Sequence, residues 1–258
     1  MIAVLGSSGT IGRHVAAGLA DRGVPMRALR RPQADLRDPA SLRAALDGPE
    51  QLFLLTPHGP DQDLLEANAV DSAAAAGVRR IVKVSGGAPS LGPNGVTSTA
   101  VGHWRSERRI EDSGLAFCFL RPSFLMQNLD AMKPQAGLLL APMGHAPIAM
   151  VDARDVAACA AAALLDDSLD GAVQVTGPAG VTFKDVARLL GALYVNVPPR
   201  LAAKALRRRG ASAFEVDHSL RMAAYFASGA DGVATDAVRR LTGRSPRTVQ
   251  QYLKENRS

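Results

Sequence analysis

The chain has 258 residues, of which 47% are hydrophobic and 21% are charged. This composition excludes a disordered chain, and the length fits one large α/β domain or a main domain with a modest appendage. The longest apolar run, Val156 to Leu165, is too short to cross a bilayer, so we expect no membrane partner. The first residues lack an export signal, and Cys118 and Cys159 lie far apart in apolar runs. We therefore expect a cytoplasmic protein with reduced cysteines.

The net charge of +6 comes mostly from one segment. Between Asn196 and Ser212 no acid occurs, and the cations there are Arg200, Lys204, Arg207, Arg208 and Arg209. A single basic helix end is usually a solvated face. Aromatic residues make up 4% of the chain and form no platform on which bases could stack. We expect no nucleic-acid partner.

Short apolar strands alternate with helices over the first two-thirds of the chain. We predict strands at 1–5, 26–29, 51–55, 80–84 and 116–120, and helices at 10–22, 39–46, 61–76 and 98–113. Continuous apolar strands that are each followed by a helix are typical of a parallel sheet covered on both faces. The predicted fold class is therefore α/β, with a doubly wound parallel sheet.

The pattern loosens after about residue 124. A Gly/Pro/Met-rich loop at 137–147 precedes a helix at 152–165, a strand at 172–176 and a helix at 182–190. From Pro198 onward the chain is nearly all helical. Because a helical tail cannot extend a sheet, we expect a small, mostly helical cap. We divide the chain into a domain at 1–135 and a C-terminal region at 136–258 that is partly interleaved with it.

The first predicted strand runs directly into a Gly-x-x-Gly-x-x-Gly loop and a helix. Gly6 permits the tight turn, Gly9 lets the backbone approach a pyrophosphate, and Gly12 lets the helix pack closely on the strand. Free N–H groups at the start of the helix would then face the phosphates. Such turns also occur without ligands, but this position favours a dinucleotide. Residues 1–135 are accordingly predicted to be a Rossmann domain.

The end of the second predicted strand distinguishes NAD from NADP. Arg30 and Arg31 stand where an acid would bind the ribose 2′-hydroxyl, and the first acid is Asp35. A guanidinium group instead pairs with a 2′-phosphate through two hydrogen bonds. The sequence therefore favours NADP(H) as the cofactor, and two solvated arginines are the alternative reading.

Several short motifs along the whole chain are specific in combination, although each alone is not. They are GSSGTIG at 6–12, RRP at 30–32, DLRDP at 35–39, LLTP at 54–57, SGL at 113–115, FLRPSF at 119–124, VDARDVA at 151–157, TGP at 176–178 and LTGRSPR at 241–247. In this combination the chain resembles the NmrA-like atypical short-chain dehydrogenases. That family includes NADPH-dependent quinone, azo-dye and triphenylmethane reductases, and redox-sensing regulators that bind NADP without turnover.

The resemblance implies a cofactor role for individual positions. The pyrophosphate would be held by Gly6, Ser8, Gly9, Thr10, Ile11 and Gly12, and the 2′-phosphate by Arg30 and Arg31. Asp35 and Leu36 would border the adenine, and Thr56, Pro57 and Ser85 would follow the cofactor. The nicotinamide end would be lined by Ser123, Phe124 and Asn128. The segment between Arg31 and Asp35 is shorter here than in the family, which predicts a shallower adenosine pocket.

The helix predicted at 98–113 lacks the Tyr-x-x-x-Lys pair of ordinary short-chain dehydrogenases. His103 and Glu107 occupy the positions of that pair, on one helix face. We interpret His103 as a proton donor or as a group that orients a substrate oxygen, with Glu107 fixing its ring and raising its pKa. The alternative is a helix pair that braces the pocket wall. Lys83 is interpreted as structural.

Apolar residues near the expected nicotinamide end favour a flat aromatic or polyketide-like substrate. We assign substrate contacts to His58, Trp104, Met126 and Met143, although core packing explains the methionines equally well. The histidines lack metal-ligand spacing, so no metal is expected. The function hypothesis is an NADPH-dependent reductase of a quinone, enone or related compound by direct hydride transfer, as a monomer or homodimer. A non-redox enzyme (isomerase, cyclase or dehydratase) and an NADP(H)-sensing regulator without turnover remain alternatives.

Overall fold

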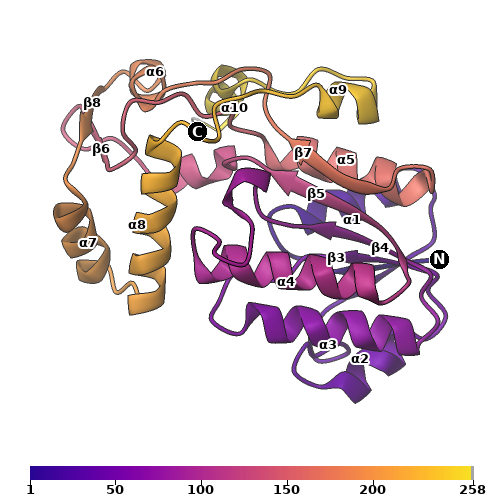
Figure 1. The fold of residues 1–258 in the computed structure, drawn as a ribbon. Helices are drawn as coiled ribbons and strands as arrows, with labels where there is room; N and C mark the ends of the chain where they lie inside the picture. Colours follow the sequence, from indigo (N-terminus) through magenta and orange to yellow (C-terminus); the bar gives the residue numbers. More distant parts are fainter. Residues whose placement is uncertain (257–258) are drawn as a thin grey trace.

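A six-stranded parallel sheet forms the centre of the molecule in the computed structural model, which describes residues 1–256 (Figure 1). Its strands, in spatial order, are β2 (Met26–Leu29), β1 (Ile2–Leu5), β3 (Gln51–Leu54), β4 (Arg80–Val84), β5 (Ala116–Pro122) and β7 (Gly171–Val175). The chain moves outward from β1 to β2 and then returns to the other side of β1 with β3. The predicted doubly wound parallel sheet is confirmed, with its switch point between β1 and β3.

Three helices cover each face of this sheet. On one face α1 (Gly12–Ala20) packs beside α5 (Ala153–Leu165), which contacts α9 (Ala237–Thr242). On the other face α2 (Pro39–Leu46), α3 (Gln62–Ala75) and α4 (Ser98–Asp112) lie side by side. Each face has its own apolar core, because strand residues that point to opposite sides are buried under different helices.

Local sequence determines where several of these helices begin. The Asp38 side chain accepts a hydrogen bond from the Ala40 N–H at the start of α2, and the Thr97 side chain does the same for Ala100 at the start of α4. Such caps satisfy N–H groups that have no partner within the helix, and each contributes about 1 kcal/mol. The predicted helix starts at 39 and 98 coincide with these caps.

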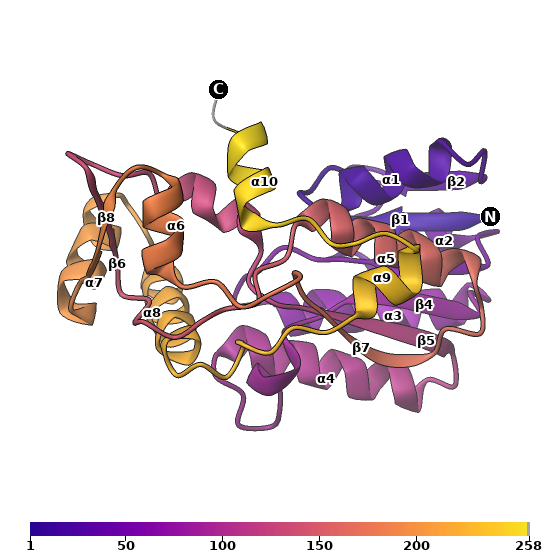
Figure 2. The same cartoon turned by 90° about the horizontal axis from the view of Figure 1, so that it is seen from above.

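The C-terminal region adds a second, smaller body at the carboxyl ends of the strands (Figure 2). It holds a two-stranded parallel sheet of β6 (Leu138–Ala141) and β8 (Leu193–Asn196). Around it lie α6 (Phe183–Leu189), α7 (Pro199–Arg208), α8 (Ala213–Ala227) and α10 (Val249–Glu255). The sequence predicted a loop at 137–147 and no strand near 193, so both strands of this sheet were missed.

Two elements of the C-terminal stretch, α5 and β7, belong to the main sheet and its helical cover. The chain then crosses to the second body and returns with α9, as both views show (Figures 1 and 2). A separate core of aromatic and aliphatic side chains holds the second body together. No helix within residues 1–256 combines the length and apolar character needed to cross a membrane.

Candidate active site

The glycine loop between β1 and α1 is held in shape by two of its three glycines. Gly6 has a φ of +77°, and a Cβ atom there would lie 2.5 Å from the Leu55 carbonyl oxygen. A Cβ atom on Gly12 would lie 2.0 Å from the Gly6 oxygen. At Gly9 the nearest atom would be that same oxygen, at 3.3 Å, with nothing else within 4 Å. Gly6 and Gly12 are therefore required by the loop itself, whereas Gly9 faces open space.

The start of α1 presents donors that the protein does not use. Neither the Thr10 nor the Ile11 N–H has an acceptor within residues 1–256, and no side chain caps this helix. Unpaired N–H groups at the N-terminus of a helix attract anions. The loop therefore fits a phosphate-bearing ligand, and the contacts predicted for its individual residues, Ser8 among them, stay predictions.

Arg30 and Arg31 follow β2 directly, next to this loop. The Ser7 hydroxyl donates to the Leu29 oxygen at 3.5 Å, which ties the loop to the end of β2. Both arginines are exposed, and neither forms an ion pair with any residue in the described part of the chain. Two uncommitted guanidinium groups beside a phosphate loop fit the additional phosphate of NADP.

The segment after these arginines forms a turn that leads into α2. The Asp35 carboxylate accepts from the Arg37 N–H at 2.9 Å, and the Leu36 oxygen accepts from Asn68 Nδ2 at 2.9 Å. Both residues are half-buried. Their proposed contact with adenine stays a prediction.

A buried charge cluster lies behind the ends of β3 and β4. Lys83, on β4, donates from Nζ to Glu66 Oε1 on α3 at 2.6 Å, and both side chains are fully buried. The Thr56 hydroxyl donates to the same oxygen at 2.8 Å. Pairing and hydrogen bonding make the burial of these charges tolerable. The second oxygen of Glu66, Oε2, has no partner in residues 1–256.

His103, on α4, joins this cluster. Its Nδ1 lies 3.1 Å from Lys83 Nζ, and Gln62 Nε2 lies 3.0 Å from both ring nitrogens. Because an ammonium group can only donate, Nδ1 accepts from Lys83 and the neutral ring carries its hydrogen on Nε2. The Gln62 amide then turns its oxygen, which has no other partner in residues 1–256, towards Nε2. Burial, followed by the charge of Lys83, lowers the pKa of His103 well below its usual range. The upward pKa shift predicted from the sequence is wrong.

Glu107 has a different partner from the one predicted. Its carboxylate oxygens accept from Nε of Arg121 on β5, at 3.0 Å, and from Nη2 of the same side chain. Glu107 is fully buried, and the pair connects α4 to the sheet. The expectation that Glu107 fixes the ring of His103 is therefore wrong, and so is the alternative of a His103–Glu107 pair that braces the pocket wall, because Glu107 pairs with Arg121 instead.

Two further histidines extend from His103 towards the C-terminal body. The ring centroids of His58 and His103 are 5.8 Å apart, and those of His58 and His218 are 5.4 Å apart. His58 follows β3 and is exposed, whereas His218 lies on α8 and is half-buried. Desolvation by the surrounding protein, followed by the charge on His218, lowers the pKa of His58 to about 4. Within residues 1–256 no histidine, cysteine and carboxylate group is arranged to hold a metal ion.

Ser85 and Ser123 differ in what their hydroxyl groups do. Ser85, just after β4, is buried, and its Oγ has no partner in the described chain. Ser123 donates to Asp231, and burial raises the pKa of that carboxyl group. An unpaired buried hydroxyl at the carboxyl edge of the sheet is available to bond a ligand there. The hydroxyl of Ser123 is already engaged.

Three of the apolar residues that were expected to contact the nicotinamide or the substrate belong to the core. Phe124, Met126 and Met143 are all less than 6% exposed and pack in the second apolar core. The substrate contacts predicted for Met126 and Met143 are wrong for this conformation, because neither side chain reaches a surface. Trp104 is half-buried, and its assignment stays a prediction, as do those of the exposed residues Pro57 and Asn128.

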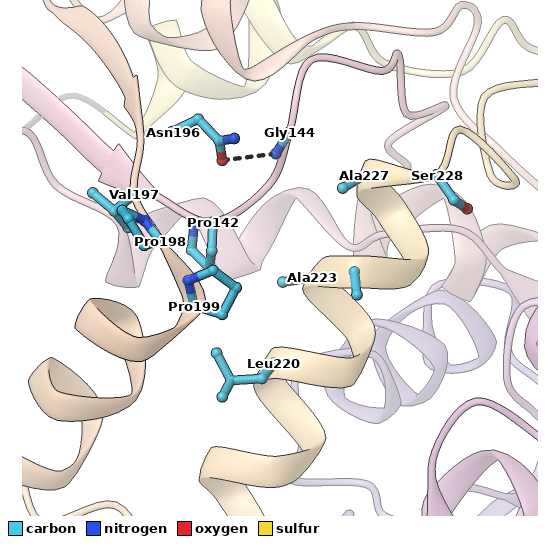
Figure 3. Close-up of a pocket in the computed structure, with 11 residues that line it drawn as sticks. Pro142, Gly144, Asn196, Val197, Pro198, Pro199, Leu220, Ala223, Ala227 and Ser228 are labelled. Atoms are coloured by element: carbon cyan, nitrogen blue, oxygen red, sulfur yellow. Dashed lines mark hydrogen bonds between the residues drawn. The ribbon is translucent and has the colours of Figure 1, made fainter.

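One cavity lies beside the buried cluster, and another lies within the C-terminal body. The smaller, of about 280 Å³, is lined in part by Gln62, Asp63 and Arg105, next to the buried cluster. The larger, of about 550 Å³, lies between β8, α7 and α8 and is mostly apolar (Figure 3). Its α8 residues, such as Leu220 and Ala227, lie on the opposite side of that helix from His218. The larger cavity is therefore separate from the histidine cluster.

Sequence reasoning missed Gln62 and Glu66. They lie one helical turn apart on the buried side of α3, in a stretch that was predicted to be a helix but was given no site residue. The available signal was Lys83 between Val82 and Val84 in a buried strand, because a buried lysine requires an acidic partner on a neighbouring element.

Comparison with known proteins gives this architecture a family. The NmrA-like family matches residues 1–192. The chain belongs to the NmrA-like family. An NAD(P)H azoreductase from Xenophilus azovorans is 32% identical, over 98% of this chain and 97% of that protein. A (4-alkanoyl-5-oxo-2,5-dihydrofuran-3-yl)methyl phosphate reductase from Streptomyces griseus is 34% identical, over 99% of this chain and 98% of that protein.

Solved structures agree on the fold of this NmrA-like chain. An NADPH-dependent quinone oxidoreductase from Escherichia coli, complexed with NADPH, superposes with a TM-score of 0.86 at 24% identity and covers 100% of both chains. The triphenylmethane reductase of Citrobacter sp., complexed with NADP(H), gives a TM-score of 0.81 at 20% identity, over 98% of this chain and 99% of that one. The resemblance read from the sequence motifs is confirmed at the level of family and fold.

Proposed function

We propose that this chain is an NADPH-dependent reductase of quinone- or azo-type aromatic small molecules. The observation that carries the proposal is the similarity to two reductases, at 32% and 34% identity, over nearly the full length of every chain compared. The glycine loop, its unpaired N–H groups and the two uncommitted arginines support a cofactor with a 2′-phosphate.

The cofactor would be bound by residues at the carboxyl edge of β1 and β2. The N–H groups of Thr10 and Ile11 would donate to the pyrophosphate, Gly9 would leave room for it, and Arg30 and Arg31 would pair with the 2′-phosphate. When bound, NADPH supplies a hydride for transfer to an electron-poor acceptor. The unpaired hydroxyl of Ser85 would gain a partner on the same edge.

The buried cluster would position the substrate rather than act as a strong acid. Lys83 donates to Nδ1 of His103, so Nε2–H of the neutral ring, which now lies beside the Gln62 amide, would be the donor to the substrate. Such a group orients a substrate oxygen or nitrogen, and solvent supplies the proton that follows the hydride. Glu66 and Gln62 fix the positions of the lysine and the imidazole.

The test is a panel of quinones and azo dyes mixed with NADPH, with the loss of NADPH absorbance as the readout. We expect turnover with at least one class, and none in Gly9→Val, which serves as the control for cofactor binding. If NADPH binds tightly but no compound is reduced, the proposal fails, and an NADP(H)-sensing protein and a non-redox enzyme are the alternatives that remain. Measuring the consumption of each compound in the same panel identifies a non-redox enzyme, because such an enzyme consumes substrate without consuming NADPH.

A further inference from the structure

One face of the two-stranded sheet is apolar and uncovered. The register of β6 and β8 pairs Leu138 with Leu193 and Leu140 with Val195, so these four side chains share one face. We call this surface the outer sheet face. Leu193 is 72% exposed, Leu140 51% and Val195 39%. Clustered exposed aliphatic side chains mark an interaction site on a water-soluble fold.

Helix α7, which follows β8, carries the basic segment of the chain. Its exposed side presents Leu201, which is 58% exposed, together with Lys204 and Arg208, while Ala203 is buried. The remaining exposed cations are Arg200, Arg207 and Arg209. Within residues 1–256 none of these five cations forms an ion pair. Both views place α7, β6 and β8 together, at the end of the molecule away from the main sheet (Figures 1 and 2).

We propose that the outer sheet face and α7 together form a docking surface for an anionic phospholipid bilayer. Exposed leucines enter the boundary between headgroups and acyl chains, and the flanking cations pair with lipid phosphates. Each basic side chain near an anionic surface strengthens binding about fivefold. Neither the aliphatic face nor the cations alone would be sufficient, and here they are joined by only two residues, Val197 and Pro198.

Charge favours this occupant over a second copy of the chain. A dimer formed through the outer sheet face would bring two copies of the five-cation segment towards one interface. No acid occurs between Asn196 and Ser212 to neutralise them. Like charges gathered at an interface oppose association, whereas an anionic bilayer neutralises them.

Docking on a surface is compatible with the lack of a spanning helix. The expectation of no membrane partner rested on the length of apolar runs, which excludes crossing the bilayer and does not address adsorption to it. If the proposed function holds, docking would bring the site close to apolar aromatic compounds dissolved in the bilayer. The test below requires neither substrate nor cofactor, so its failure and the failure of the proposed function are distinguishable.

The experiment is sedimentation of the full chain with vesicles of phosphatidylcholine alone or mixed with phosphatidylglycerol. We expect binding to the anionic vesicles only, and release at about 1 M salt, where the screening length falls to about 3 Å. Arg200→Gln/Lys204→Gln/Arg208→Gln should lower partitioning on the order of a hundredfold. The matched control Arg43→Gln/Arg239→Gln/Arg240→Gln removes three exposed charges elsewhere and should bind like the wild type.

A second variant tests the apolar half of the surface. Leu193→Ser/Val195→Ser should weaken vesicle binding at least tenfold while the thermal unfolding midpoint is unchanged, because both side chains are exposed. Absence of sedimentation with anionic vesicles, or an equal loss in the matched control, would overturn the proposal. It would also fail if the wild type dimerises in solution and this variant does not, because a second copy would then cover the face.

Discussion

Lys83 Nζ lies 3.1 Å from His103 Nδ1 and 2.6 Å from Glu66 Oε1, so one buried ammonium group connects an imidazole to a carboxylate. The three groups come from β4, α4 and α3. The contact determines which ring nitrogen carries the hydrogen and helps to keep the imidazole neutral. The chemistry available to His103 therefore depends on a lysine that does not face solvent.

Breaking the ion pair between Lys83 and Glu66 should destabilise the fold. Lys83→Met leaves the Glu66 carboxylate buried without its cation, which costs about 3–5 kcal/mol. Lys83→Met/Glu66→Gln removes both charges and should recover most of that loss. Urea unfolding of the two variants and the wild type measures the difference. If the double variant is as unstable as the single one, lost packing is the cause and the charge argument fails.

Acid should also destabilise the protein through His103. Its pKa in the folded state lies well below 6.5. At a pH below 6.5 the imidazole is therefore protonated in the unfolded chain but stays neutral in the folded chain. The free energy of unfolding then falls by about 1.4 kcal/mol per pH unit below the unfolded pKa. In His103→Gln this contribution is absent, so the difference in unfolding free energy between wild type and variant should shrink as the pH is lowered. A constant difference between about pH 7 and about pH 5 would show that the ring titrates normally.

The sequence predicted the main sheet well because its strands contain apolar runs, as in Leu52–Leu54, and its helix starts carry caps such as Asp38. The strands β6 and β8 were missed for a physical reason. Each has four residues, and their pairing joins Leu138 to Leu193 across more than fifty residues of chain. No local pattern encodes such a contact.

In the candidate site, too, the sequence predicted local features and missed contacts between distant segments. The glycine loop and the arginines could be proposed from the sequence because a phosphate site uses the backbone groups and adjacent side chains of one local segment. Their contacts with a cofactor stay predictions. Glu66 was missed and Glu107 received the wrong partner, because their ion pairs link a helix to a strand. Spacing along one helix suggested a pair between His103 and Glu107, but Arg121 forms the stronger contact, with two hydrogen bonds to the carboxylate.

Cofactor preference should depend on Arg30. Loss of a charged hydrogen bond to the 2′-phosphate in Arg30→Ala is worth roughly 1.5–3 kcal/mol, or about tenfold to a hundredfold in NADPH affinity. NADH affinity should hardly change, because NADH lacks that phosphate. Titration of both cofactors measures this, with Arg43→Ala on the exposed side of α2 as the control. Equal affinity of the wild type for NADPH and NADH would contradict the assignment.

The glycines of the loop should respond differently to a side chain. Gly9→Val should stay folded, because a Cβ there meets only the Gly6 oxygen, at 3.3 Å. It should lose NADPH binding, because the side chain would occupy the space of the pyrophosphate. Gly12→Val should unfold more easily, since its Cβ would lie 2.0 Å from that oxygen. Thermal unfolding and NADPH titration separate the two effects. A folded Gly9→Val that retains NADPH affinity would make the loop a structural turn only.

Turnover should depend on His103 to a limited extent. In His103→Ala we expect a loss of less than tenfold in kcat with NADPH affinity unchanged, because a neutral ring orients the substrate without donating a proton as imidazolium. The wild-type rate should stay flat through the usual histidine range near pH 6.5, since the buried ring does not titrate there. Measurement of kcat against pH for wild type and variant decides between orientation and acid catalysis. A loss of about 10³-fold, together with a wild-type rate that falls as the pH rises and a variant rate that does not, would make His103 the general acid.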